Sequence, residues 1–260
     1  METQGTLFLV GIAGLSFALS FYGAAVGLIL GHLRLPLLIY YLPSTTAGMA
    51  TNLAISGLGA LTGSARHARA GRVSWPMVAL MGVPSLVGAA LGGLLLVKVE
   101  ASLARIFIGG FLLVTGVSLF RPREDGPSVG AVALRGGRIA LEVVIGLALG
   151  VLASLTGLML GSLRLPAMIR LLKLDPQIAV GTNMAIGCVT ALCGAFSLWP
   201  FGESVPVLPL LVVVPPTIVG GYLGARFTGR FRKETLHRLI GATIVLTGVG
   251  MVTEGALRFV

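Results

Sequence analysis

Long apolar runs separated by short polar stretches fill this chain from one end to the other. Each run is continuous rather than alternating, and most are about 20 residues long, the length that an α-helix needs to cross a bilayer. A transmembrane β-barrel would show alternating positions, so that fold is excluded. The pattern predicts an all-α membrane protein with eight hydrophobic elements, at residues 6–30, 44–63, 73–97, 102–120, 138–160, 176–198, 205–228 and 236–257.

The pattern also repeats. A twelve-residue phrase that contains Leu-Arg-Leu-Pro occurs at residues 30–41 and again at residues 160–171. Further stretches match at offsets of 130 to 132 residues: 50–55 with 181–186, 84–92 with 216–224, and 115–117 with 247–249. The chain is therefore predicted to be an internal duplication of four elements, with a first membrane repeat at 1–120, a polar linker at 121–137 and a second repeat at 138–260.

Composition agrees with a membrane protein and excludes several other classes. Hydrophobic residues make up 55% of the chain, charged residues 11%, and the mean hydropathy is +0.98. The net charge of +10 is expected in turns and near lipid headgroups, so we do not expect nucleic acid as a partner. The start of the chain, Met1 to Gly5, has no basic stretch, and no cleavable signal peptide is expected.

The basic residues do not decide the membrane orientation if all eight elements are full spans. One side then collects eight arginines and the other nine lysines and arginines, so the positive-inside rule gives no preference. The turn between the second and third elements is basic, whereas its counterpart near Glu203 is acidic. Inverted repeats would produce that exchange, but four full spans per half require parallel repeats. An element that enters and leaves on the same face would remove the conflict, and the question stays open.

The repeated Leu-Arg-Leu-Pro phrase is the main candidate for binding chemistry. Proline favours the first turn of a helix and disfavours helical geometry before it, so a helix is expected to begin at each proline. The free N–H groups of that helix start and the planar fork of an arginine would suit an oxyanion. The alternative is that both arginines lie at the interface and reach lipid phosphates. The predicted binding residues of the two phrases are Arg34, Arg164, Pro36, Pro166, Gly31 and Gly161.

A Thr-Asn pair follows each phrase. Thr51 and Asn52, and likewise Thr182 and Asn183, lie early in predicted spans and would offer hydroxyl and amide groups to a bound oxyanion. Ordinary hydrogen bonding between helices, worth about 1 kcal/mol per contact, is the alternative. Weaker candidates of the same kind are Ser56, Thr62 and Thr190.

Two residues are candidates for proton coupling. His32 adjoins the first phrase and would titrate near neutral pH, although a polar residue at the interface would look the same. Glu142 lies at the start of the fifth element, where it would either take part in a proton path or neutralise Arg138 one turn earlier. No catalytic residue, metal site or cofactor is expected: the phosphate-binding Gly-x-x-x-x-Gly-Lys motif and zinc-site spacings are missing, Cys188 and Cys193 included.

These features resemble the sulfite exporter TauE/SafE family, also called the toluene sulfonate uptake permeases, over nearly the whole chain. The similarity lies in the glycine-to-proline stretches at residues 27–36 and 157–166, each followed by a small residue with a threonine, and in the turn at residues 64–75. The family's run of three glycines is reduced to Gly31-His32 and Gly161-Ser162. The resemblance implies a multi-pass permease of the prokaryotic inner membrane for sulfur-containing anions.

The sequence thus predicts a secondary transporter that exports a small anion such as sulfite, thiosulfate or a sulfonate. The duplicated phrases of a transporter are expected to meet near the membrane midplane, around the binding site. A passive anion channel and a membrane scaffold without a substrate are the competing interpretations. The expected partners are the anion and membrane lipids, and the sequence leaves a homodimer open.

Overall fold

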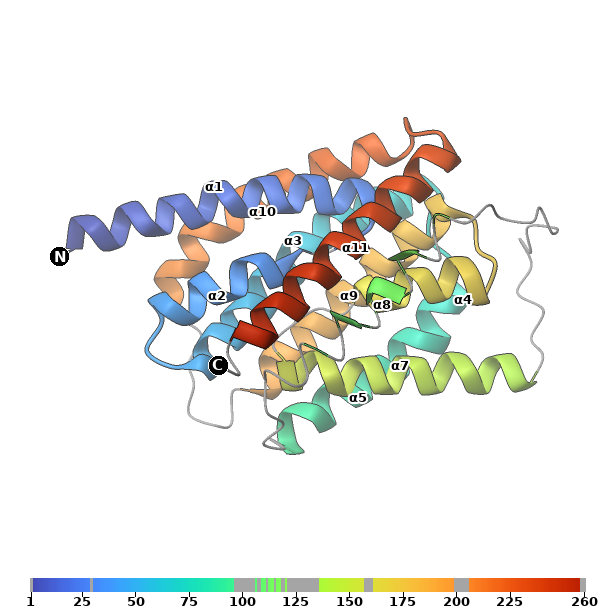
Figure 1. The fold of residues 1–260 in the computed structure, drawn as a ribbon, viewed down its shortest axis with the longest axis horizontal. Helices are drawn as coiled ribbons and strands as arrows, with labels where there is room; N and C mark the ends of the chain where they lie inside the picture. The colour runs from blue at the N-terminus through green and yellow to red at the C-terminus, as the bar shows by residue number, and fades with distance from the viewer. Residues whose placement is uncertain are drawn as a thin grey trace.

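The structure is a computed structural model that describes residues 2–28, 30–95, 106, 109–110, 112–114, 116–117, 120, 136–156, 161–198 and 206–257. Helices fill most of this part (Figure 1). They are α1 (Glu2–Val26), α2 (Gly31–Tyr41), α3 (Thr45–Arg69), α4 (Trp75–Met77), α5 (Val83–Leu95), α7 (Gly136–Thr156), α8 (Gly161–Pro166), α9 (Pro176–Ser197), α10 (Val207–Thr228) and α11 (Lys233–Leu257). Two π-helical segments, η1 (Val78–Gly82) and η2 (Ala167–Leu171), continue α4 and α8.

Five helices of the described part are long and apolar enough to cross a membrane. These spans are Leu7–Val26, Trp75–Gly92, Pro176–Ser197, Val207–Thr228 and Glu234–Leu257. A shorter apolar helix covers Ile139–Ser154. The chain is therefore a multi-pass membrane protein. Most of the predicted fourth element and nearly all of the predicted linker lie outside the described residues.

Glycines end two helices at positions that the hydrophobic pattern missed. Gly27 has φ +76°, and the Leu28 N–H donates to the Gly23 carbonyl at 2.8 Å, so α1 stops at Val26 instead of residue 30. Gly71 has φ +67° and ends α3 at Arg69, six residues later than predicted. Glycine adopts this left-handed conformation without a steric cost, which makes it the usual stop for a helix.

Both short helices begin five residues before their prolines. α2 begins at Gly31 and contains Pro36, and α8 begins at Gly161 and ends at Pro166. The predicted helix starts at the prolines are therefore wrong. Once the chain is broken after α1, a helix can start at once, and a later proline removes only one backbone hydrogen bond. After Pro166 the backbone widens into η2, which accommodates the lost bond.

The chain between the end of α1 and the end of α2 runs back along the whole of α3. With 25 residues, α3 is about 37 Å long, enough to cross a hydrocarbon core of about 30 Å. α2 follows it in the opposite direction. Three contacts mark this path, from the end of α3 to its start: Ala24 with His67, Gly31 with Ser56, and Ile39 with Gly48.

The long helices form two sets that run in opposite directions (Figure 1). α1, α3 and α10 run one way, because the residue numbers of their contacts rise together: Phe17 with Gly220, Phe21 with Gly224, Gly59 with Thr217 and Gly63 with Gly221. α5, α7 and α9 form the second set for the same reason: Gly88 with Leu147, Gly92 with Val151, Gly82 with Ile186 and Leu86 with Cys193. Helices α3 and α9 run in opposite directions. Along their contacts the residue number rises in α3 while it falls in α9: Gly57 contacts Leu192 and Gly63 contacts Met184.

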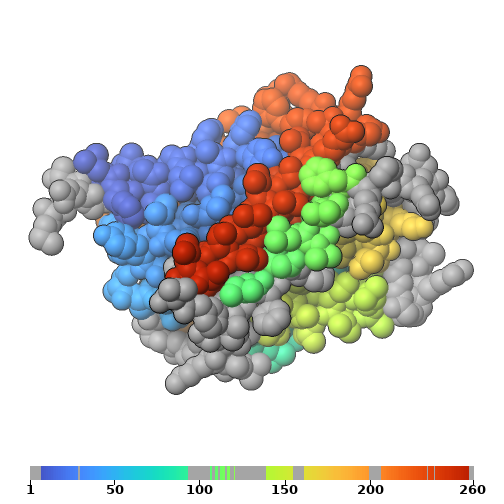
Figure 2. All heavy atoms as spheres, viewed as in Figure 1, coloured from blue at the N-terminus to red at the C-terminus, as the bar shows by residue number. Residues whose placement is uncertain are grey.

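These directions define two ends of the helix bundle. At the Arg72 end, α3 and α10 finish and α9 and α11 begin; at the Tyr40 end, α2 finishes and α3 begins. α11 runs back from the end of α10 across the face shown in Figure 2, next to α2. The short helices are held by a buried apolar cluster that includes Leu35, Leu165, Met168, Ile169, Met81, Ile186 and Ile240.

Candidate functional site

Arg34 lies in the first turn of α2 and is buried, with 3% of its surface exposed. Its Nε and Nη2 donate to Asn52 Oδ1 at 3.1 and 2.9 Å, and Nη2 also donates to Ser56 Oγ at 2.8 Å. Nη2 reaches the Asn52 carbonyl at 3.3 Å, and Nη1 donates to Ser16 Oγ at 3.3 Å. Side chains of α1 and α3 therefore hold the guanidinium through neutral oxygens, and none of these partners is a carboxylate.

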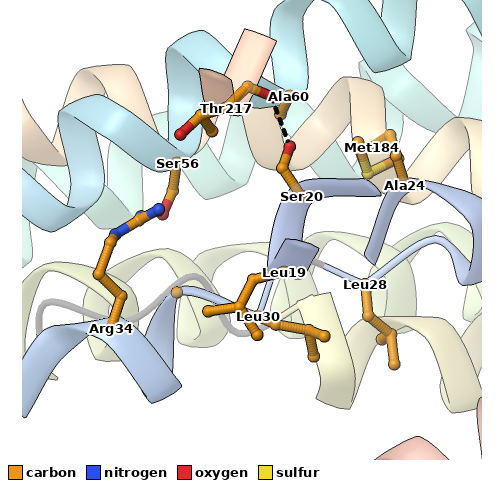
Figure 3. Close-up of a pocket in the computed structure, with 11 residues that line it drawn as sticks. Leu19, Ser20, Ala24, Leu28, Leu30, Arg34, Ser56, Ala60, Met184 and Thr217 are labelled. Carbon is orange, nitrogen blue, oxygen red and sulfur yellow. Dashed lines mark hydrogen bonds between the residues drawn. The ribbon is translucent and has the colours of Figure 1, made fainter. Parts of the chain in front are cut away.

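Gly31 lets α2 approach α3 closely enough for those bonds. A Cβ atom at this position would lie 2.6 Å from Ser56 Oγ and 3.2 Å from the Asn52 side chain. Beside the arginine is a cavity of about 20 Å³ between α1, α2, α3, α9 and α10, drawn in Figure 3. This volume holds one water molecule and is too small for an oxyanion of four heavy atoms. Leu19, Leu28, Leu30 and Met184 line much of it.

Arg164 occupies the matching place in α8 and is equally buried, with 2% of its surface exposed. Its surroundings differ from those of Arg34. Nη1 makes a long contact with Asn183 Oδ1, at 3.5 Å, and Nε has no hydrogen-bond partner in the part of the chain that the structure describes. Arg164 is therefore a buried cation with an unused donor. We call it, with Gly161 and Asn183, the Arg164 half-site, and call Arg34 with Gly31, Asn52, Ser56 and Ser16 the Arg34 half-site.

The sequence explains the difference between the half-sites. At the offset of the long matches, the position of Ser56 is taken by Gly187, and that of Ser16 by Gly146. The two serines whose hydroxyls accept bonds from Arg34 thus correspond to glycines in the second half, so no hydroxyl is present at these positions for Arg164. Aligning the two halves of the sequence at these offsets is enough to reveal the asymmetry.

Asn183 also connects the two halves of the chain. Its Nδ2 donates to the Gly27 carbonyl at 2.8 Å and to the Gly161 carbonyl at 3.1 Å. These carbonyls belong to the break after α1 and to the start of α8, so one amide fixes both irregular segments. The predicted Asn residues accordingly contact both arginines and both glycines of the repeated phrases.

The threonines next to these asparagines are buried but do not contact the arginines. Thr182 Oγ1 accepts a bond from the Ser74 N–H at 2.9 Å and so ties α9 to the turn before α4. Thr51 Oγ1 has no hydrogen-bond partner in the described part of the chain. Pro166 is buried in its half, and Pro36 lines a second cavity described next.

His32 faces away from the Arg34 half-site, into a cavity of about 130 Å³ between α2 and α11. Its Nε2 is buried and has no hydrogen-bond partner among the residues that the structure describes. Glu254, Thr247 and Met251 line the same cavity from α11. Glu254 is an acid within a predicted span, but the hydropathy pattern alone did not distinguish it as a candidate beside Glu142.

The other titratable candidates lie elsewhere. Glu142 is fully buried on α7, while the side chain of Arg138, its predicted partner, lies outside the described residues. His67 is fully buried near the end of α3, which runs on past residue 63, and its ring faces the Ala24 carbonyl. Ser56 was only a weak candidate from sequence, and Ser16 was not one.

The chain is similar to known membrane transporters over this whole arrangement. The profile described as Sulfite exporter TauE/SafE matches residues 12–251, nearly the whole chain. The chain belongs to the TauE/SafE family. The matched residues include both arginines and the short helices that carry them.

Three relatives from Bacillus subtilis (strain 168) are similar to this TauE/SafE chain. Probable membrane transporter protein YdhB is 27% identical over 94% of this chain and 96% of its own length. Probable membrane transporter protein YjnA is 26% identical over 89% and 96%. Probable membrane transporter protein YunE is 31% identical over 45% of this chain and 42% of its own length. No solved structure matches the chain at a significant level. These findings make the protein a membrane transporter.

Proposed function

We propose that this protein is a secondary transporter that exports small sulfur-containing anions, such as sulfite or organosulfonates, across a prokaryotic inner membrane. The observation that carries the proposal is Arg164, a buried arginine whose Nε has no hydrogen-bond partner among the described residues and whose Nη1 contacts the neutral amide of Asn183. The TauE/SafE family supports the sulfur-anion class of substrate.

A buried cation without a counter-charge is costly. Translocon scales put an arginine at the centre of a membrane helix at about 2.5–3.5 kcal/mol. Arg164 lies within the short helix α8, among the buried residues Gly161, Leu163 and Leu165. An oxyanion bound there would receive charge-assisted hydrogen bonds from the guanidinium fork and offset this cost. The bound anion would therefore provide the counter-charge and the hydrogen-bond acceptors for Arg164.

The Arg34 half-site serves the same anion in a different state of the transport cycle. In the described state its donors are used by Asn52, Ser56 and Ser16, and the cavity beside it admits only a water molecule. Binding there needs α2 to move away from α3, which would free the guanidinium. The conformation described here is thus closed at Arg34.

The two halves are proposed to be inverted repeats of five crossings each, in which the second crossing is the broken one. Matched residues make matched contacts in support of this. Thr62 donates to the Ile218 carbonyl at 3.0 Å, and Cys193, its counterpart, contacts the Leu86 carbonyl at 3.5 Å. The pairs of α1 with α10 and of α7 with α5 correspond in the same way. Broken crossings in inverted repeats are a common location for substrate sites in transporters.

Proton coupling, if it accompanies transport, is proposed to involve His32 with Glu254. The two side chains line one cavity, and α2 places His32 two residues before Arg34 on a neighbouring face. Arg34 is the charged residue that lies close to His32 on α2. A change in the charge of His32 would act on the position of α2 and so on the Arg34 half-site. Glu142, buried on α7, is a second candidate for a proton path.

Binding to the purified protein is the first experiment. Sulfite, thiosulfate and methanesulfonate are compared with acetate as agents that raise the unfolding temperature, because a ligand at 100 times its Kd stabilises the folded state by about 2.7 kcal/mol. We expect stabilisation by the sulfur anions in the wild type and its loss in Arg164→Ala. Arg69→Ala, which removes an exposed arginine, is the matched control and should respond as the wild type does.

Flux into proteoliposomes then separates the three interpretations. A transporter gives saturable, counterflow-competent uptake that Arg164→Ala abolishes. A channel gives flux without saturation or counterflow, and a scaffold gives none. Comparing uptake under an imposed pH gradient at zero membrane potential in wild type and His32→Gln tests coupling. Equal dependence on the gradient in both proteins would remove His32 from the mechanism.

A further inference from the structure

Positive charge is concentrated at one end of the helix bundle. In the described part of the chain, the turns and terminal helix turns of the Arg72 end carry nine arginine and lysine residues that reach the surface: Arg66, Arg69, Arg72, Arg170, Lys173, Arg226, Arg230, Arg232 and Arg238. Asp175 and Glu234 are the acids described there. Among the described residues of the Tyr40 end, at 41–45, 197–198, 206–207 and 254–257, no arginine or lysine is present.

The broken crossing causes this imbalance. If α1 and α3 were consecutive full spans, they would run in opposite directions, and the turn after α3 would face the side opposite to the turn after α10. Because the chain from Gly27 to Tyr41 crosses back along α3, the helices α1, α3 and α10 run the same way. The basic turns at residues 66–72 and 226–232 therefore lie at the same end. A layout of eight full spans would place these two basic turns on opposite sides of the membrane, and the basic residues would then be nearly equal in number on the two sides.

Aromatic residues mark the two interfaces. At the Arg72 end, Trp75 is 62% exposed, the Arg66 guanidinium lies 5.8 Å from the centre of the Tyr222 ring, and that of Arg230 lies 5.1 Å from Phe227. At the opposite end, Tyr40 is 84% exposed. Tyrosine and tryptophan gather at both membrane–water boundaries, whereas lysine and arginine favour the cytoplasmic one.

The arginines at this end crowd one another. Partial burial, and then the charge of Arg66, lower the pKa of Arg72 from its ordinary value. Arg72 Nη1 donates to the Ala225 carbonyl at 3.4 Å, which links the end of α10 to the turn after α3. Anions near this surface would reduce the repulsion, and anionic lipid headgroups are the anions that every cytoplasmic leaflet supplies.

We infer that the Arg72 end faces the cytoplasm against anionic lipid headgroups, and that the Tyr40 end, with the start of α1 and the end of α11, faces the outside. This inference concerns orientation and does not depend on the substrate. It implies that α2 leads from the Arg34 half-site outward, whereas α8 and η2 lead from the Arg164 half-site toward the cytoplasm.

The orientation can be tested by introducing single cysteines and measuring their labelling with a membrane-impermeant thiol reagent. In a Cys188→Ala, Cys193→Ala background, exposed positions that carry no charge are replaced: Ala70→Cys and Thr235→Cys at the Arg72 end, and Thr45→Cys at the Tyr40 end. In intact cells we expect labelling of Thr45→Cys at least tenfold above that of the other two. After permeabilisation all three should label, and the background should not.

Each other pattern overturns the inference in its own way. Labelling of Ala70→Cys and Thr235→Cys, but not Thr45→Cys, in intact cells would mean the reverse orientation. Labelling of only one of Ala70→Cys and Thr235→Cys would mean that the two basic turns lie on opposite sides. Gly229→Cys, at another exposed position of the Arg72 end, replaces either variant if it fails to label after permeabilisation. None of these results depends on transport, so a failure here is distinct from a failure of the proposed function.

Discussion

The Arg34 and Arg164 half-sites start from the same residues and differ in how the arginine is held. Each arginine is the fourth residue of a short helix that begins with a glycine packed against an asparagine. Arg34 has contacts with Asn52, Ser56 and Ser16, whereas Arg164 has one long contact with Asn183 and an unpaired Nε. The two matching phrases thus share the charge and differ in its hydrogen bonding.

This difference separates two roles that sequence alone would assign to both residues. A guanidinium whose three nitrogens all donate to the protein, as in Arg34, stabilises the packing of α1, α2 and α3 and is less available to a ligand. A guanidinium with an unused donor contributes less to packing and is available to an anion. The comparison therefore predicts that mutations at matched positions have unlike effects.

The largest expected difference is in stability. Arg34→Ala removes the donors of Asn52 and Ser56, and each buried acceptor left unpaired costs about 1–3 kcal/mol, so a loss of roughly 2–6 kcal/mol is expected. Arg164→Ala removes a poorly paired buried charge and should change stability by less than about 1 kcal/mol. Thermal unfolding in one detergent measures both. Equal losses in the two variants would contradict the comparison.

Anion binding should show the reverse order. Arg164→Lys keeps the charge but loses the planar fork, so sulfite affinity should fall by about 10- to 150-fold, corresponding to 1.5–3 kcal/mol. Arg34→Lys should change affinity less than threefold in the described state. Titration calorimetry on purified protein gives both values, with Arg69→Lys as the exposed control. If Arg34→Lys has the larger effect, the assignment of the two half-sites is reversed.

A smaller effect is expected from making the second half-site resemble the first. Gly187→Ser restores a hydroxyl at the position of Ser56, where it can accept a bond from Arg164. Since a hydrogen bond contributes about 1 kcal/mol net, anion affinity should drop by roughly fivefold relative to Gly187→Ala. The alanine variant is the control because it adds almost the same volume without the hydroxyl. Identical affinities in the two variants would mean that the missing hydroxyl does not matter.

The smallest effect concerns the threonines. Thr182→Val leaves the Ser74 N–H without its partner and should cost about 0.5–1.5 kcal/mol. Thr51→Val removes a buried hydroxyl that makes no bond and should be neutral or slightly stabilising. Unfolding temperatures report the difference. A larger loss in Thr51→Val would indicate that its hydroxyl has a partner in another state of the transport cycle.

Local sequence signals predicted much of the fold. Apolar runs of spanning length placed α5, α9 and α10 to within a few residues at most ends, since burial in lipid requires an apolar helix of that length. The starts of α2 and α8 were predicted wrongly because the expectation rested on the general preference of proline for the first turn of a helix. Here the break at Gly27 had already freed the chain to form a helix at Gly31.

The sequence by itself indicated a membrane protein of transporter type and predicted a duplication, because hydropathy, the repeated Leu-Arg-Leu-Pro phrase and the Asn positions are local features that can be recognised without knowing the fold. It also identified residues that contact each other, Arg34 with Asn52 and Arg164 with Asn183. The tertiary structure alone decided the direction of each helix, and hence which basic turns share an end. It also decided which arginine keeps an unused donor, because that depends on hydroxyls contributed by other helices, at distances in the chain that no local pattern records.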